Sequence, residues 1–360
     1  MSAKKWFSIS ISFFLFISIS LWSFVFLTDP YGYFSKNNKY IYNLTHIDYP
    51  NVIHNKILSK SDIYLLGSSR QMRINPLLVE KSTGKSVQCI AQMTATLDDT
   101  IFLAHKIKEL DKNFIFSFDA FSLNASRIKS KQELRDRLDI YKKEFENDKD
   151  TTQLNTYIKN NIYLSIFNMD ILLASLQHNF SRLSGKAYNY NELDENSYDY
   201  PLIKSVLKHS FSNLNNPSFV ANNFTGLFKN YLSYSDATII KLAKLATKDD
   251  IFVIYPKHAY YYKLFQEYQN VQEQYFHAIK TLVNNTDARV ISFYDVNEQT
   301  LEDKNFDFFA WHFKPKIGDL IIENIYQKDS KKKIISYELR PDNIDNYLQM
   351  ISTKVKESFR

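Results

Sequence analysis

The pattern of hydrophobic and polar residues alternates between short apolar runs and longer amphipathic segments. Apolar runs at residues 63–66, 86–91 and 113–118 predict three buried strands, and runs at 251–255 and 289–293 predict two more. Between them, apolar residues recur at helical spacing. Such β-α-β alternation favours parallel strands joined by right-handed crossovers. We therefore expect an α/β fold built on a doubly wound, mainly parallel sheet of five strands.

Helices are predicted from near Pro76, over Asp98–Leu110, as one helix over Tyr260–Val283, and from near Lys316. The last thirty residues, 331–360, carry an amphipathic helix to which the sequence gives no evident purpose. We expect these residues to form a helical tail outside the domain.

The alternation stops between the third and fourth strands. Residues 119–247 contain a charged helix, a longer helix and a polar, Tyr-rich stretch. We interpret them as a helical insertion within a domain that spans residues 61–330. An irregular lead-in at residues 28–60 precedes that domain.

The N-terminus carries the longest apolar stretch. Residues 6–27 contain no charged side chain, and a helix of this length crosses a bilayer core of about 30 Å. Lys4 and Lys5, in the short tail 1–5, favour a cytoplasmic N-terminus. A cleaved signal peptide is the alternative, but it needs a shorter apolar core and a small-x-small site, which "FVFLTDPYGYF" does not offer.

We therefore expect a single-pass signal anchor that holds the domain outside the cytoplasm. The abundance of Asn, Lys, Ile and Tyr is typical of an AT-rich bacterial genome. The membrane would then be the bacterial inner (cytoplasmic) membrane, and the domain would lie in the periplasm of a cell with two membranes.

Charge and cysteine content exclude several classes of function. The net charge is +6, but the lysines alternate with acids, as in "IKSKQELRDRLDIYKKEFENDKD", which is typical of a solvated helix face. We expect no nucleic-acid partner. One cysteine allows neither an internal disulfide nor a cysteine metal cluster. No His-x-x-x-His pair or Gly-rich phosphate loop appears, so we expect no metal and no cofactor.

The first predicted strand ends in Gly67-Ser68-Ser69. A serine at a strand-to-helix turn has an exposed hydroxyl beside backbone N–H groups that favour a developing oxyanion. The alternative is that Ser68 or Ser69 caps the following helix. The α/β-hydrolase elbow Gly-x-Ser-x-Gly is not formed, because Gln71 replaces its second glycine.

A serine nucleophile needs a base. His312 lies between Trp311 and Phe313, just before the last core helix, and its alternative role is that of a packed surface residue. Because ligands bind beyond the carboxyl ends of the strands in such sheets, we expect Ser69 and His312 to meet there.

Four sequence stretches resemble the SGNH (GDSL-type) hydrolases, in particular a membrane-anchored branch associated with cell-envelope polysaccharides. "YLLGSSRQMRINP" resembles the first block of that family, and "HFKPKIGDLIIENI" resembles the closing block. "DPYGYF" and "VIYPKHAYYY" are similar to its juxtamembrane segment and to one strand end. The resemblance covers the sheet but not the insertion, and it implies a flavodoxin-like SGNH fold.

The resemblance implies that Ser69 is the nucleophile, that its own N–H is an oxyanion donor, and that His312 is the base. In the family an acid lies three residues before the histidine. Phe309 occupies that position here, and Asp307 is the nearest upstream acid, so we take Asp307 as the candidate third member.

Three further residues that follow strand ends are candidates for contact with the substrate: Arg70, Asp119 and His258. Asp119 is in the region of the family's third-block asparagine. For His258, the alternative is an ordinary polar loop residue. The second block, "QCIAQMTAT", lacks the family's glycine.

The resemblance implies acyl-ester chemistry on a cell-envelope glycan, either O-acetyl transfer or ester hydrolysis through an acyl-Ser69 intermediate. Implied partners are the polysaccharide or its acyl donor, and a membrane-bound acyltransferase or glycan-export protein. The alternative is a scaffold or glycan-binding protein that keeps the fold without the chemistry, which Phe309 and the missing glycine favour.

Overall fold

The protein is described by a computed structural model that covers residues 2–28, 60–92, 94–127, 230–306, 312–327 and 334–359, with a few isolated positions between 57 and 228. The chain divides into two compact units. Residues 1–59 and 140–189 form the first, which contains the N-terminal helix. Residues 60–139 and 190–360 form the second, which contains the sheet.

The N-terminal helix, α1, runs from Ala3 to Thr28, slightly beyond the predicted stretch 6–27. Its 26 residues measure about 39 Å at 1.5 Å per residue, longer than a bilayer core of about 30 Å. Its apolar side chains are exposed, including Phe13 at 65 % and Phe16 at 68 %. In the described part of the chain, it is the one helix long and apolar enough to cross a membrane.

The second unit is built on a six-stranded sheet with the order β2-β1-β3-β4-β5-β6. The five predicted strands are present and pair in parallel: β1 Ile63–Leu66, β2 Val87–Cys89, β3 Asn113–Ser117, β4 Ile251–Ile254 and β5 Arg289–Ser292. All four residues of β1 and of β4 are buried, as expected of parallel strands covered on both faces.

The predicted number of strands is wrong by one. A sixth strand, β6 Tyr337–Leu339, pairs antiparallel with β5 at the sheet edge. Only Leu339 in it is buried and Glu338 is exposed, so this short edge strand has no apolar run that the sequence pattern could reveal.

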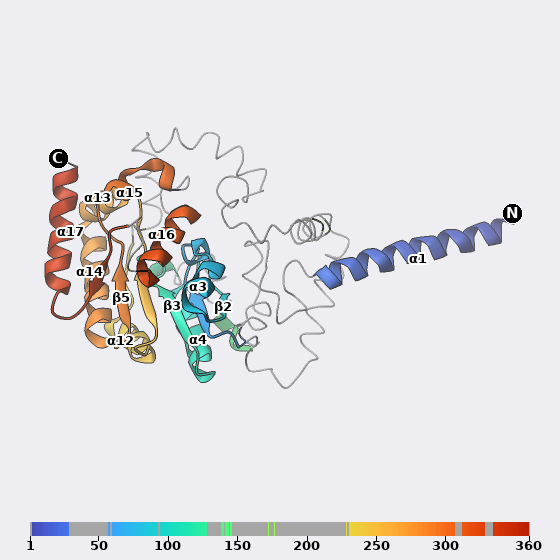
Figure 1. The fold of residues 1–360 in the computed structure, drawn as a ribbon, viewed down its shortest axis with the longest axis horizontal. Helices are drawn as coiled ribbons and strands as arrows, with labels where there is room; N and C mark the ends of the chain where they lie inside the picture. Colours follow the sequence, from blue (N-terminus) through green and yellow to red (C-terminus); the bar gives the residue numbers. More distant parts are fainter. Residues whose placement is uncertain are drawn as a thin grey trace. The chain divides into compact units, whose positions relative to one another are not determined.

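The helices of this unit form two groups (Figure 1). In one, α3 Pro76–Thr83 packs against α16 Pro315–Tyr326. In the other, α12 Asp236–Leu245 packs against both α4 Leu97–Glu109 and α14 Gln269–Asn285. With right-handed crossovers in this strand order, the two groups cover opposite faces of the sheet.

The predicted single helix over Tyr260–Val283 is instead two helices, α13 Ala259–Glu267 and α14 Gln269–Asn285. The break is at Tyr268, whose ψ of 71° is not helical. No glycine or proline marks the break, so the sequence pattern runs through it. Short elements complete the unit: η2 Gln71–Arg73, α15 Glu298–Leu301 and η5 Asp303–Asn305.

The two ends of the predicted insertion 119–247 come together. Asn124 and Ser233 form an isolated antiparallel bridge, and the Ala125 N–H donates a 2.8 Å hydrogen bond to the Leu232 carbonyl. The following helix, α12, packs with the sheet's own crossover helices. The β/α alternation therefore resumes before Thr247, and the insertion's predicted helices lie outside the described residues.

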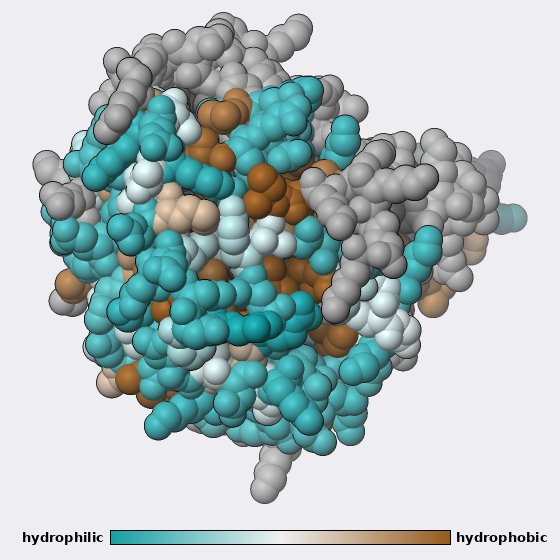
Figure 2. All heavy atoms as spheres, turned by 60° about the vertical axis from the view of Figure 1, so that its left-hand side comes forward, coloured by the Kyte–Doolittle hydropathy of each residue, from teal (hydrophilic) through white to brown (hydrophobic). Residues whose placement is uncertain are grey.

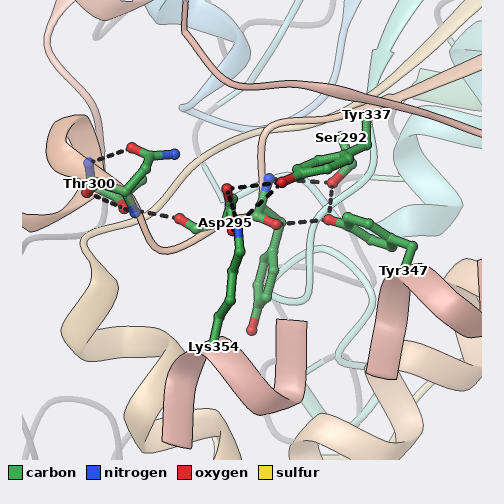
Figure 3. Close-up of polar contacts among 8 residues, drawn as sticks. Ser292, Asp295, Thr300, Tyr337, Tyr347 and Lys354 are labelled. Carbon is green, nitrogen blue, oxygen red and sulfur yellow. Dashed lines mark hydrogen bonds and ion pairs between the residues drawn. The ribbon is translucent and has the colours of Figure 1, made fainter. Parts of the chain in front are cut away.

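The last residues belong to the fold and are not a detached tail. α17 Ile344–Ser358 packs against α13 and α14 through buried side chains that include Tyr347. The Tyr347 hydroxyl lies 2.6 Å from the Ser292 Oγ and donates to the Tyr294 carbonyl at 2.7 Å (Figure 3). Figure 2 shows the side of this unit on which α17 lies in Figure 1; the surface there is mainly hydrophilic, with hydrophobic residues gathered near the middle of the view.

Candidate active site

The loop after β1 begins with a glycine that no other residue can replace without strain. Gly67 has a φ of +142°, and a Cβ built on it would lie 2.5 Å from the Cβ of Ser117 on β3. Only glycine therefore lets β1 end this close to β3. The chain then turns through Ser68, Ser69 and Arg70 into η2.

Neither serine is a cap for the helix that follows. Asn75 caps α3, because its side chain accepts hydrogen bonds from two N–H groups of the first turn. The Ser68 hydroxyl donates instead to Oδ2 of Asp119, at 2.8 Å. The alternative interpretation of these serines as helix caps is therefore wrong, and the Ser69 hydroxyl serves another purpose.

The structure brings Ser69 and His312 together, as expected. The Ser69 Oγ lies 2.7 Å from Nε2 of His312, although the two residues are 243 positions apart in the chain. This distance is within the range in which a histidine can act as base for a serine. Among the described residues, the Ser69 N–H donates no hydrogen bond.

The histidine segment is held against the serine segment by close backbone packing. The Lys314 N–H donates to the Asn305 carbonyl at 2.9 Å, and Phe313 is buried. Gly318 on α16 faces the carbonyl oxygen of Arg73, and a Cβ at this position would collide with that oxygen. This contact joins α16, which begins three residues after His312, to η2, which begins two residues after Ser69.

Tyr255, at the end of β4, contacts both segments. Its hydroxyl donates a 2.9 Å hydrogen bond to Oε1 of Gln71, and its ring centroid lies 5.2 Å from that of Phe313. Burial raises the pKa of Tyr255 well above its usual range, so the hydroxyl remains a donor. Tyr255 therefore links the turn that carries Ser69 to the segment that carries His312.

Arg70 and Asp119 form a buried ion pair beneath the Ser69 turn. The Nη1 of Arg70 lies 2.8 Å from Oδ1 of Asp119, and both side chains are at most 1 % exposed. Burial acts to raise the pKa of Asp119, but the charges of Arg70 and Lys257 and the Ser68 hydrogen bond lower it to about 2. Asp119 is thus a carboxylate at neutral pH.

Lys257 is a second buried basic side chain near this pair. Its Nζ lies 5.4–5.6 Å from the ring centroids of Phe265, Tyr275 and Tyr294. Burial lowers the pKa of Lys257 well below its ordinary value, and the charge of Arg70 adds to this, whereas Asp119 opposes it. The carboxylate of Asp119 therefore interacts with two basic side chains.

The three residues expected to contact substrate have other partners. Arg70 and Asp119 are buried and bind each other, which suits support of the turn and not contact with a ligand. His258 caps α13, since its Nδ1 accepts from the Tyr260 N–H at 3.2 Å, and its ring packs against Phe306. Asp307 and Phe309 lie outside the described residues.

Sequence reasoning missed Gln71, Tyr255, Lys257 and Gln92. Gln92 follows β2, where its N–H donates to the Gly67 carbonyl at 3.0 Å and its side-chain amide is buried with no partner in the described part of the chain. Each lies within three residues of a strand end or of Ser69, and that position is the one indication of a role in the sequence.

No protein-family model matches the chain, and comparisons with curated proteins and with solved structures gave no match. Among the described residues, no group of three or more His, Cys, Asp or Glu side chains is arranged to hold a metal ion.

Proposed function

We propose that the protein is a serine-dependent acyl-ester enzyme that transfers or hydrolyses acyl groups through an acyl-Ser69 intermediate. The observation that carries the proposal is the 2.7 Å contact between the Ser69 Oγ and His312 Nε2. Both residues follow the core strands β1 and β5, where α/β sheets of this kind bind ligands.

The geometry supports the following reaction. His312 Nε2 takes the proton of the Ser69 hydroxyl while Oγ attacks the ester carbonyl carbon, forming a C–O bond and an oxyanion. In this mechanism the Ser69 N–H, which donates no hydrogen bond within the described residues, serves as a donor to that oxyanion. When the oxyanion collapses, the bond to the leaving alcohol breaks, and His312 returns the proton to the departing oxygen. The product is acyl-Ser69.

The second half-reaction regenerates the serine. His312 takes a proton from an acceptor hydroxyl, whose oxygen attacks the acyl carbon and displaces the Ser69 Oγ, which recovers the proton. Water as acceptor gives hydrolysis, and a sugar hydroxyl gives O-acyl transfer. Both outcomes use the same residues of this chain.

The resemblance to the SGNH hydrolases supports an acetyl ester of a cell-envelope glycan as the substrate. The strand order of β1 to β5, which is 2-1-3-4-5, agrees with the doubly wound sheet that the resemblance implies. An anchor formed by α1, with Lys4 and Lys5 on the cytoplasmic side, would hold the domain in the periplasm. There it would meet a membrane-bound acyl donor or a glycan-export partner.

The second candidate is a non-catalytic scaffold or glycan-binding protein with the same fold. Phe309 favours it, because this position carries the acid in the family that the sequence resembles. Without an acid to orient and charge the imidazole, a serine–histidine pair loses much of its reactivity.

A trapping experiment distinguishes the two candidates. The full chain in detergent is incubated with p-nitrophenyl acetate, quenched in acid, and analysed by intact mass and peptide mapping. The enzyme acquires an acetyl group on Ser69 that Ser69→Ala and His312→Ala do not acquire. A folded protein that releases no p-nitrophenol and stays unmodified supports the scaffold.

A further inference from the structure

The two chain neighbours of Ser69 bind the same carboxylate. The Ser68 hydroxyl donates to Oδ2 of Asp119, and the Arg70 guanidinium pairs with Oδ1, both at 2.8 Å. The carboxylate itself is fixed, since its Oδ1 also accepts hydrogen bonds from the N–H groups of Phe121 and Ser122, at 2.9 and 3.0 Å.

We propose that Asp119 is a positioning residue that clamps the nucleophile turn from both sides, so that Ser69 is held at hydrogen-bonding distance from His312. This inference rests on the proposed function. Asp119 is 1 % exposed, and the partners of its carboxylate include Ser68, Arg70 and two N–H groups of its own loop. It acts through Ser68 and Arg70, whose fixed side chains leave the residue between them little freedom.

A carboxylate is the one side chain that satisfies this arrangement. It offers two acceptor oxygens, one for each neighbour of Ser69, and a charge that balances the buried Arg70. In Asp119→Asn, one oxygen becomes an NH₂ donor, so either the Ser68 hydroxyl loses its acceptor or the Arg70 guanidinium faces a donor in place of a carboxylate oxygen. The guanidinium also loses its counter-charge in a buried site, which loosens the turn.

The chain offers a matched control at the opposite end of the sheet. Asp250 is fully buried just before β4, where it pairs with Lys108 and accepts hydrogen bonds from Phe114 and Thr247. Asp250→Asn therefore removes the same charge from a similarly bonded, buried carboxylate. Asp250→Asn should affect folding about as much as Asp119→Asn does, but the changed side chain lies away from the nucleophile turn.

The test measures how fast a fluorophosphonate labels Ser69 in the full chain, per folded molecule and over a range of probe concentrations. In Asp119→Asn the maximal labelling rate should fall about 10²-fold, the effect of a misplaced reacting group, while the half-saturating probe concentration stays the same. Asp250→Asn should remain within about 3-fold of wild type. An equal fall in both variants would overturn the clamp.

Ser68→Ala gives a second, milder test that leaves the ion pair intact, and it decides the matter if Asp119→Asn does not fold. In the wild-type background, Ser68→Ala should slow labelling about 10-fold. Combined with Asp119→Asn, it should slow labelling by less than a further 2-fold, because both changes break the same contact. Full additivity, or no effect of Ser68→Ala alone, would contradict the clamp.

Hydrogen exchange separates failure of the clamp from failure of the proposed function. Peptides covering residues 67–71 should exchange faster in Asp119→Asn and Ser68→Ala than in wild type or Asp250→Asn. Unchanged exchange there rejects the clamp whether or not the protein is an enzyme. A wild-type chain that the probe does not label rejects the proposed function, and with it the catalytic purpose of the clamp.

Discussion

The hydroxyl of Tyr255 donates a 2.9 Å hydrogen bond to Oε1 of Gln71, two residues after the candidate nucleophile. The same ring packs on Phe313, the residue after the candidate base. One aromatic side chain thus joins two segments that are far apart in the sequence and that must meet for the site to work.

Replacing Tyr255 with Phe should keep the ring contact and remove the hydrogen bond. Gln71 Oε1 is buried and would lose its donor, which costs about 1–3 kcal/mol of the free energy of unfolding. Denaturant titration of the full chain in detergent measures this loss. Tyr260→Phe is the control, because the Tyr260 hydroxyl forms no hydrogen bond within the described residues, and its change should stay within about 0.5 kcal/mol.

Gly318→Ala should reduce reactivity more than it reduces stability. The new methyl group would push α16 away from the Arg73 carbonyl, at a cost of about 1–3 kcal/mol, and would move His312 away from Ser69. We expect labelling by a fluorophosphonate to slow by about 10-fold or more.

Gly84→Ala is the matched control for that substitution. Gly84 is the C-cap of α3, where it has a φ of +68°, and a Cβ added to it would meet no other atom. Alanine at this position should therefore lower the free energy of unfolding by about 1–2 kcal/mol through backbone strain alone. Its labelling rate should equal that of wild type. Equal slowing in both glycine variants would mean that lost stability, and not a displaced His312, explains the effect.

The stability of the fold should depend on Asp119 in acid. Its pKa of about 2 in the folded state lies below the ordinary value of 3.8. Such a group contributes stability that is fully present above the unfolded pKa and is lost as pH falls from about 4 to about 2, in total about 2 kcal/mol. Urea titrations between pH 5 and pH 2.5 should therefore show a steeper decline for wild type than for Asp119→Asn. Parallel declines would show that Asp119 has an ordinary pKa in the folded protein.

The ion pair between Lys354 and Asp295 should matter for stability and not for reactivity. Nζ lies 3.0 Å from both oxygens of the buried Asp295, and the Tyr337 hydroxyl completes the cluster (Figure 3). Lys354→Met leaves that carboxylate without its cation and should lower the free energy of unfolding by about 1–3 kcal/mol. The exposed Lys356→Met should change it by less than about 0.5 kcal/mol.

The labelling rate of folded Lys354→Met should match that of wild type, since β6 and α17 lie at the far edge of the sheet from β1. A large loss of labelling at unchanged stability would assign the C-terminal elements to the site.

The sequence predicts the part of this fold that buried apolar runs encode. The five parallel strands are recognisable because both of their faces are covered, and the meeting of Ser69 with His312 follows from their places after strand ends. β6 is not predicted, because an edge strand with one buried residue has no apolar run in its sequence. The break at Tyr268 is not predicted because no glycine or proline marks it.

The role of Asp119 shows why the finer structure of the site could not be predicted. A polar residue after a strand can face a ligand or lie beneath a neighbouring turn, and the sequence does not distinguish these positions. The close approach of β1 to β3 at Gly67 brings Asp119 under Ser68 and Arg70. That contact depends on the distance between two strands, which no local pattern specifies.

The measurement that tests the central claim most directly is fluorophosphonate labelling of the full chain, followed by intact mass and mapping of the modified peptide. An activated serine predicts one adduct, on Ser69, that is lost in Ser69→Ala and slowed at least about 10²-fold in His312→Ala. A folded wild-type protein that forms no adduct, or that is labelled equally well without His312, would contradict the account.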